Sequence, residues 1–278
     1  MMKHAHHGST KALYDICKSD QYDILVMGSS KAHHGIIPTV LTDSLSMTCY
    51  NAGQDGNGII LAYGMLQLID DERLPKLIIY DFKQQFDLYK IAEDGDYSRY
   101  VDFLKYFYTN ASVKALIKRV AEGEIFKLNS SFYRYNGSLV SVLSGFLRNT
   151  PSDPNLGYSP RRGVLEDSSE EIKDYSETQI DTLKFSVFKD FIRLTKERGI
   201  KLIITISPEF NAPYSEDFRP MKEVCEKEGI IVLDYFENPQ FQNKVLFFDH
   251  CHFNTAGAEF FSSKIASDIL RFFKCNIR

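Results

Sequence analysis

Three polar residues that together could hydrolyse an ester come from opposite ends of the sequence. Ser30 directly follows an apolar run at 22–27, while Asp249 and His252 lie three residues apart near the other end of the chain. A serine hydroxyl is a poor nucleophile at neutral pH until an imidazole accepts its proton, and a carboxylate on the far ring nitrogen holds that imidazole in the required tautomer. A spacing of three places both side chains on one side of a helical turn or tight loop. Ser30, His252 and Asp249 are therefore candidates for nucleophile, base and orienting carboxylate.

Glycines after a second apolar run could bind the negative oxygen that forms during such a reaction. Gly53, Gly56 and Gly58 fall within eight residues, in a segment suited to exposing backbone N–H groups. A dinucleotide-binding loop is disfavoured, because the Gly-x-Gly-x-x-Gly order is absent and the loop follows the second strand rather than the first.

The elements that must position these residues are predicted from hydrophobic patterning. Short runs that are apolar on both faces indicate buried strands of a parallel sheet, and amphipathic stretches between them indicate helices. This alternation predicts a doubly wound α/β domain, in which ligands bind at the carboxyl ends of the strands. The predicted strands are 22–27, 47–50, 77–80, 201–206 and 230–233, and the two longest predicted helices are 177–198 and 255–273.

The alternation is lost in the middle of the chain. We therefore predict a core built from 1–87 and 181–278, interrupted by a helical and loop insertion at 88–180 that caps or shapes the substrate site. Within it, 149–167 carries three prolines and two glycines, which predicts a long loop. The aromatic residues of the insertion are expected to form its core, with a stacking surface for sugar rings as the alternative.

At this point the chain resembles the SGNH (GDSL-like) hydrolases. Gly28-Ser29-Ser30 matches the family's Gly-Asp-Ser block with serine in place of aspartate, and places the family nucleophile on Ser30. The segment from Asn51 matches the second block and places an oxyanion glycine on Gly56. The resemblance implies a three-layer, flavodoxin-like sandwich with a central parallel five-stranded sheet.

The remaining two family blocks differ in how well they match. Asp249 and His252 fit the Asp-x-x-His block near the C-terminus. Where the family has Gly-x-Asn-Asp after the third strand, this chain reads Asp-Phe-Lys-Gln-Gln from Asp81, so the asparagine that donates to the oxyanion is missing. Gln84, which falls nearest that asparagine when the third strands are overlaid, is expected to supply an amide in its place.

The resemblance implies a serine-dependent ester hydrolase that removes an acyl or acetyl group from a carbohydrate or a similar ester. Two alternatives stay open. The altered third block is compatible with a binding or scaffolding domain that has kept the fold and lost the chemistry. The same triad could also serve an acyltransferase that hands the acyl group to a glycan hydroxyl.

Composition limits the other partners. Hydrophobic residues make up 44%, charged residues 25%, and the net charge is −4, which fits a globular domain and disfavours a nucleic-acid partner. The longest apolar stretch is too short and too interrupted for a membrane span. Five scattered cysteines without a Cys-x-x-Cys pair fit reduced thiols.

No cofactor is expected, and no metal at the site. The run from Asp249 to His252 contains only metal-ligand types, but adjacent residues rarely converge on one ion. The histidines within residues 1–8 form a terminal cluster of the kind that is usually mobile. If a signal or anchor has been removed before this segment, an extracytoplasmic location is expected, and otherwise a cytoplasmic one. The sequence does not predict the oligomeric state.

Overall fold

The computed structural model describes residues 9–90, 97–135, 153–166, 179–211 and 218–275. The N-terminal histidines and the helix predicted at 138–147 lie outside the described residues.

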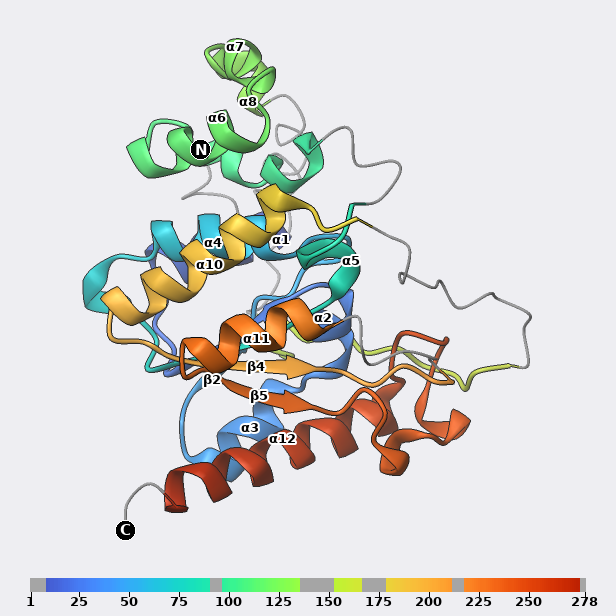
Figure 1. Cartoon of the computed structure of the whole chain (residues 1–278). Coiled ribbons are helices and arrows are strands. Elements are labelled where there is room, and N and C mark those ends of the chain that lie inside the picture. The colour runs from blue at the N-terminus through green and yellow to red at the C-terminus, as the bar shows by residue number, and fades with distance from the viewer. Residues whose placement is uncertain (1–8, 91–96, 136–152, 167–178, 212–217, 276–278) are drawn as a thin grey trace.

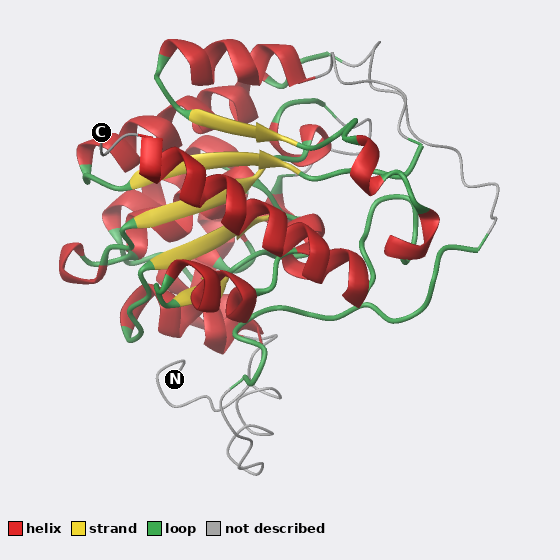
Figure 2. Cartoon of the chain, turned by 90° about the horizontal axis from the view of Figure 1, so that it is seen from below, coloured by secondary structure: helices red, strands yellow, loops and turns green. Residues whose placement is uncertain are grey.

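Five parallel strands form one sheet in the order β2-β1-β3-β4-β5 (Figures 1 and 2). The α/β fold predicted from the alternation is confirmed, and each predicted strand lies within two residues of an observed one. The strands are β1 (Ile24–Gly28), β2 (Cys49–Asn51), β3 (Leu77–Asp81), β4 (Lys201–Ile206) and β5 (Ile231–Asp234).

The sheet is buried on both faces, because alternate residues of each strand pack against different helical layers. In β3, Ile78 and Tyr80 belong to one hydrophobic cluster, while Leu77 and Ile79 belong to the other. The first layer contains α1 (Ser9–Lys18), α4 (Ile59–Leu68), α5 (Gln84–Asp87), α10 (Thr182–Glu197) and α11 (Arg219–Lys227). The second contains α2 (Ser30–Gly35), α3 (Pro38–Leu45) and α12 (Thr255–Cys275).

Local signals account for where several helices begin. Asp181 caps α10, its side chain accepting from the backbone N–H groups of Leu183 and Lys184. Pro38 opens α3, where its missing N–H has no intrahelical partner to lose. Three short 3-10 helices lie in the connections between these elements: η2 (Asp71–Arg73), η6 (Pro239–Phe241) and η7 (Lys244–Leu246).

The described parts of the insertion lie in two places. Its helical part packs on α4 and extends the first layer outward, at the top of Figure 1. Tyr100, Phe107 and Tyr108 are buried there, whereas Phe126 and Phe132 are exposed. This part comprises η3 (Ser98–Val101), η4 (Leu104–Phe107), α6 (Ala111–Val120), α7 (Glu124–Leu128) and α8 (Ser131–Tyr135).

The second part, residues 153–166, is an extended segment that we call the strap. It runs past the carboxyl ends of the strands, and is yellow-green in Figure 1. Backbone hydrogen bonds tie it to β2, where Asn51 N donates to Leu156 O (2.9 Å), and to α2, where Ser159 N donates to His33 O (3.0 Å). Gly157 lies so close to β2 that an added Cβ would come within 1.9 Å of the Asn51 carbonyl oxygen, so only glycine fits.

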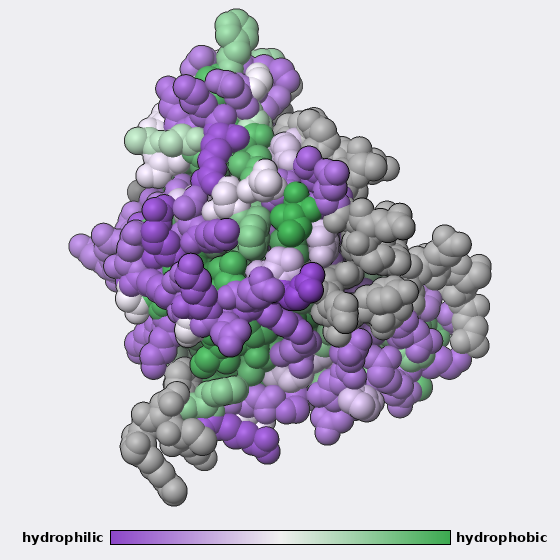
Figure 3. All heavy atoms as spheres, viewed as in Figure 1, coloured by the Kyte–Doolittle hydropathy of each residue, from purple (hydrophilic) through white to green (hydrophobic). Residues whose placement is uncertain are grey.

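The surface offers no helix, among the described residues, with the length and apolarity to cross a bilayer. On the face drawn in Figure 3, hydrophilic side chains dominate, with smaller apolar patches between them.

Candidate active site

Ser30, His252 and Asp249 meet at the carboxyl edge of the sheet. The Ser30 Oγ lies 2.7 Å from His252 Nε2. On the other side of the ring, His252 Nδ1 lies 2.8–2.9 Å from both carboxylate oxygens of Asp249. These are hydrogen-bonding distances, in the order that a proton relay from a serine hydroxyl requires.

Ser30 occupies its place because β1 ends abruptly and α2 begins at once. Gly28 has φ +144°, and an added Cβ would come within 2.6 Å of the Asp81 carbonyl oxygen, so β1 and β3 can run side by side only with glycine here. Ser29 is buried and caps α2, its hydroxyl accepting from Lys31 N. Ser30 thus becomes the first residue of α2, half-buried at the edge of the sheet.

The loop that carries Asp249 and His252 is closed on itself. Phe248 N donates to His252 O (2.9 Å), and Asp249 Oδ1 accepts from the backbone N–H groups of Cys251 (2.9 Å) and His252 (2.8 Å). Burial alone would raise the pKa of Asp249, but the His252 ring and these two N–H groups together hold it below its ordinary value. Asp249 is therefore ionised at neutral pH and able to hold the imidazole.

Two further candidates for binding the oxyanion, Gly56 and Gln84, follow β2 and β3, the strands on either side of β1. Gly56 forms a turn with Asp55 after β2 at φ +67°, and this loop is anchored to β1 by Gln54 N, which donates to Gly28 O (3.0 Å). Gln84 is buried at the start of α5, and its Oε1 has no hydrogen-bond partner among the residues that the structure describes. Among the described residues, no hydrogen bond joins Gly56 or the Gln84 side chain to the three residues of the relay.

A second polar group, which sequence reasoning did not assign to the site, lies beside the relay. The His34 ring contacts the His252 ring edge-on, with centroids 5.6 Å apart. His34 Nδ1 lies 2.7 Å from Ser159 O of the strap, and its Nε2 lies 3.0 Å from an amino group of Arg161. The strap is therefore connected to His252 through the buried side chain of His34.

The same group contains the ligand types of a metal site. One ligand atom each from His33, His34 and Asp55 lies within 4.8 Å of the others. Hydrogen bonds from the two histidines hold the pKa of Asp55 far below its ordinary value. Arg161, however, places a guanidinium group on the nitrogen that would bind the ion, and its charge opposes a cation there.

A buried ionic cluster on the other side of the relay was also missed. The ammonium groups of Lys31 and Lys83 both pair with Glu209 Oε1, and all three residues are less than a tenth exposed. Lys83 Nζ also lies 3.8 Å from the sulfur of Cys251, the neighbour of His252. Isolated lysines and glutamates in a sequence carry no signal of such burial, because they are usually solvated.

A cavity of about 390 Å³ opens between the strap and the loop after β2. Polar and aromatic side chains line it, and His33 connects it to the helix that begins at Ser30. The lining includes His33, Tyr50, Gln54, Asp153, Asn155 and Tyr158.

Comparison with known proteins gives likeness in structure alone. No model of a known protein family matches the chain, and no curated protein does. One similar solved structure is a protein assigned to the G-D-S-L family of lipolytic proteins, from Desulfitobacterium hafniense DCB-2. It is 9% identical, with a TM-score of 0.43, covering 88% of this chain and 98% of that one. Another is a protein assigned as an acylhydrolase, from Bacteroides fragilis NCTC 9343. It is 11% identical, with a TM-score of 0.44, covering 94% of this chain and 96% of that one.

The sheet places each of the sequence motifs at a defined point of the fold. A 2-1-3-4-5 parallel sheet carries serine after β1, glycine after β2, and Asp-x-x-His before the last helix. The chain therefore has an α/β fold, with a central five-stranded parallel sheet between two layers of helices. After β3 the chain departs from the SGNH block that it otherwise resembles: Lys83 and Gln84 stand where that block has asparagine and aspartate.

Proposed function

We propose that the protein is a serine-dependent ester hydrolase of SGNH type. One observation carries the proposal: the Ser30 hydroxyl, the His252 ring and the Asp249 carboxylate form a continuous hydrogen-bonded relay at the carboxyl edge of the sheet. A buried serine that merely caps a helix has no need of a histidine oriented by a carboxylate, and here Ser29 already caps α2.

The relay would act in two steps. In the first, Ser30 Oγ attacks the ester carbonyl as His252 Nε2 takes its proton, and the carbonyl electron pair moves onto oxygen. Collapse of this intermediate breaks the bond to the alcohol, which leaves with the proton from His252. In the second step, water attacks the acyl-serine in the same way and releases the acid, restoring Ser30.

The developing oxyanion needs donors that are already in place. The backbone N–H groups of Ser30, at the start of α2, and of Gly56, in its turn after β2, are the proposed backbone donors. For the side-chain donor, Gln84 is one candidate after β3 and Lys83 is the other.

The cavity beside the strap supports a carbohydrate-linked acyl or acetyl ester as the substrate. Aromatic faces and exposed carboxylate and amide groups, such as Asp153 and Asn155, suit a sugar ring with its hydroxyls. The strap, as part of the 88–180 insertion, would then be the segment that shapes the substrate site.

Fluorophosphonate labelling read by peptide mass spectrometry tests the proposal. We expect one label, on Ser30, in the wild-type protein and none in Ser30→Ala. Absence of any labelled serine, together with no hydrolysis of p-nitrophenyl acetate, would refute an esterase and favour a binding domain with the same fold. The wild-type protein could instead form an acylated sugar when it is given an acyl donor and a free glycan. That result would assign an acyltransferase.

A further inference from the structure

The sheet register decides which residue of the altered third block lies level with the nucleophile. Gly28 of β1 pairs with Asp81 of β3. Two residues beyond this pair, the chains reach Ser30 on one side and Lys83 on the other. Lys83 therefore stands at the level of Ser30 on the neighbouring strand end.

The pleat of β3 decides which face of the sheet Lys83 occupies. Leu77 and Ile79 face the layer of α2 and α12, whereas Tyr80 and Phe82 face the opposite layer. Lys83 keeps an extended backbone (φ −121°, ψ +110°), so its side chain continues on the first of these faces. That face carries Ser30 and His252. Gln84, in contrast, already belongs to α5, which packs on α4 and α10.

Contacts of the Lys83 ammonium group agree with this placement. Its Nζ lies 3.8 Å from Cys251 Sγ, which places it against the loop that holds His252. It also pairs with Glu209 Oε1. Lys31 Nζ lies 3.0 Å from the same oxygen, so both lysines contact the Glu209 carboxylate. Lys31 follows Ser30 directly in the sequence and also donates to Ser207 O (2.8 Å).

The ammonium groups of Lys31 and Lys83 lie against the same buried carboxylate. Two ammonium groups share the single carboxylate of Glu209, whose pKa lies at about 2 because the attraction of Lys31 and Lys83 outweighs its burial. A further carboxyl group, that of Asp81, interacts with both lysines; burial raises its pKa, and its Oδ1 accepts from the hydroxyl groups of Thr205 and Ser207. Charges so shielded from water act on a neighbouring reaction centre far more strongly than charges at the surface.

We propose that the Lys83 ammonium group stabilises the oxyanion from the position of the missing family asparagine, and that Glu209, fixed by Lys31, is a positioning residue for it. The inference rests on the proposed esterase function. Lys83 keeps its proton throughout: the serine proton passes to His252, the carbonyl electron pair moves onto the oxygen that Lys83 faces, and both return when the ester bond breaks. The side chain thus contributes charge and takes no part in proton transfer.

Steady-state hydrolysis of p-nitrophenyl acetate by three variants tests this assignment. Lys83→Met is expected to lower kcat by about 10²–10³, as loss of one oxyanion donor does, with KM changed by less than about threefold. Gln84→Ala, at the other candidate donor, is expected to lower kcat by less than Lys83→Met does. The matched control is Lys184→Met, which removes another fully buried lysine, one that donates to backbone carbonyls at Gln85 and Tyr89. Its kcat is expected to stay near the wild-type value.

The same series overturns the inference if Lys83→Met turns over at the wild-type rate, or if Gln84→Ala alone shows the large loss in kcat. Should Lys83→Met fail to give a folded circular dichroism spectrum, Lys83→Arg, which retains the charge, is the deciding variant. We expect it to keep a larger share of kcat than Lys83→Gln, and equal losses in the two would refute a role for charge.

Failure of the inference and failure of the proposed function give different results. If the wild-type protein neither hydrolyses the ester nor reacts with a fluorophosphonate, the esterase proposal falls and this inference falls with it. If the wild-type protein does both and Lys83→Met matches it, the esterase stands and Lys83 has no part in its chemistry.

Discussion

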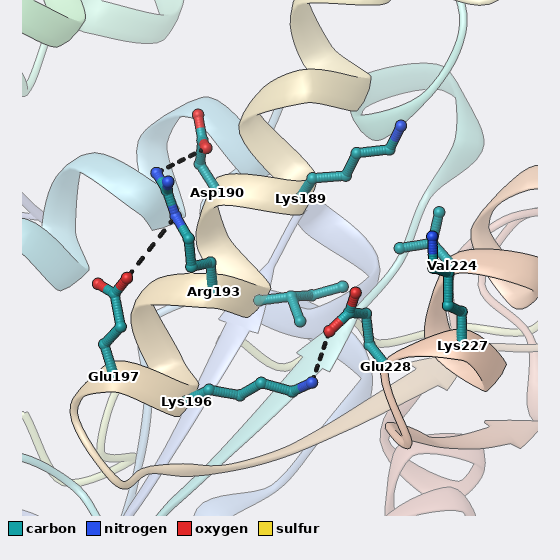
Figure 4. Close-up of a pocket in the computed structure, with 9 residues that line it drawn as sticks. Lys189, Asp190, Arg193, Lys196, Glu197, Val224, Lys227 and Glu228 are labelled. Carbon is teal, nitrogen blue, oxygen red and sulfur yellow. Dashed lines mark hydrogen bonds and ion pairs between the residues drawn. The ribbon is translucent and has the colours of Figure 1, made fainter.

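Charged side chains gather in two regions of this molecule, and their surroundings differ. One is the groove between α10 and α11, with a volume of about 500 Å³ (Figure 4). Its pairs, such as Lys196 with Glu228 (2.6 Å) and Arg193 with Asp190 (2.9 Å), involve side chains that are between 23% and 65% exposed. The other is the carboxyl edge, where the side chains of Lys31, Lys83 and Glu209 are 2%, 7% and 8% exposed.

The two regions differ in burial and in how polar side chains converge, and we base the proposed active site on these two properties rather than on cavity size. Water screens the ion pairs of the groove, which therefore contribute little. The described residues that line it include no serine, cysteine or histidine. At the carboxyl edge, Ser30 and His252 are hydrogen-bonded to each other, and the buried cluster of Lys31, Lys83 and Glu209 contacts Cys251 beside them.

Loss of the nucleophile is the largest effect we expect from the catalytic edge. Ser30→Ala should lower kcat on p-nitrophenyl acetate by about 10⁴–10⁶, because it removes the hydroxyl group proposed to form the acyl intermediate. Ser29→Ala should cost much less, since that hydroxyl only caps α2. A Ser30→Ala protein with near wild-type turnover would show that the relay is not catalytic.

Glu209→Gln tests how much the carboxylate that Lys31 and Lys83 share contributes to the stability of the fold. The change removes the carboxylate charge that both buried ammonium groups contact, and breaking a buried pair costs about 3–5 kcal/mol of unfolding free energy. Urea titration at pH 7 measures it. The surface counterpart, Glu228→Gln, should leave the urea midpoint unchanged, and equal losses in both variants would erase the distinction between the two regions.

The cluster should also make stability fall in acid. The folded-state pKa of Glu209, about 2, lies below its ordinary value of 4.5, so its ionised form stabilises the fold above pH 4.5. This contribution is lost as the pH falls from about 4.5 to about 2. Unfolding free energy measured across that window should decline less steeply in Glu209→Gln than in the wild-type protein, and parallel curves would contradict the prediction.

The smallest effect is expected in the groove. Lys196→Ala removes the Lys196–Glu228 pair but touches nothing near the relay. Its kcat and KM on the same ester should stay within about twofold of wild type, as is usual for surface changes remote from a site. A large loss of kcat would link the groove to catalysis and contradict the distinction between the two regions.

Much of the fold and the relay could be predicted from the sequence. Strands that are buried on both faces appear as continuous apolar runs, so all five were found from hydrophobicity alone. Ser30, Asp249 and His252 stood out because a nucleophile at a strand end and a carboxylate three residues before a histidine are uncommon combinations with a clear chemical use. The structure brings them to hydrogen-bonding distance.

Other features were decided only by the tertiary structure. Lys83 and Glu209 lie 126 residues apart, and Lys31 and Glu209 lie 178 apart. In the sequence each is an ordinary charged residue, because nothing local distinguishes a solvated lysine from a buried one. Their meeting depends on the parallel registers of β1, β3 and β4, which align three strand ends at one edge. The strap is similar: prolines and glycines predict a loop, but only its long-range hydrogen bonds place it beside His34. Local patterning determines which elements form, whereas contacts between distant strand ends determine which side chains share a buried, weakly screened environment.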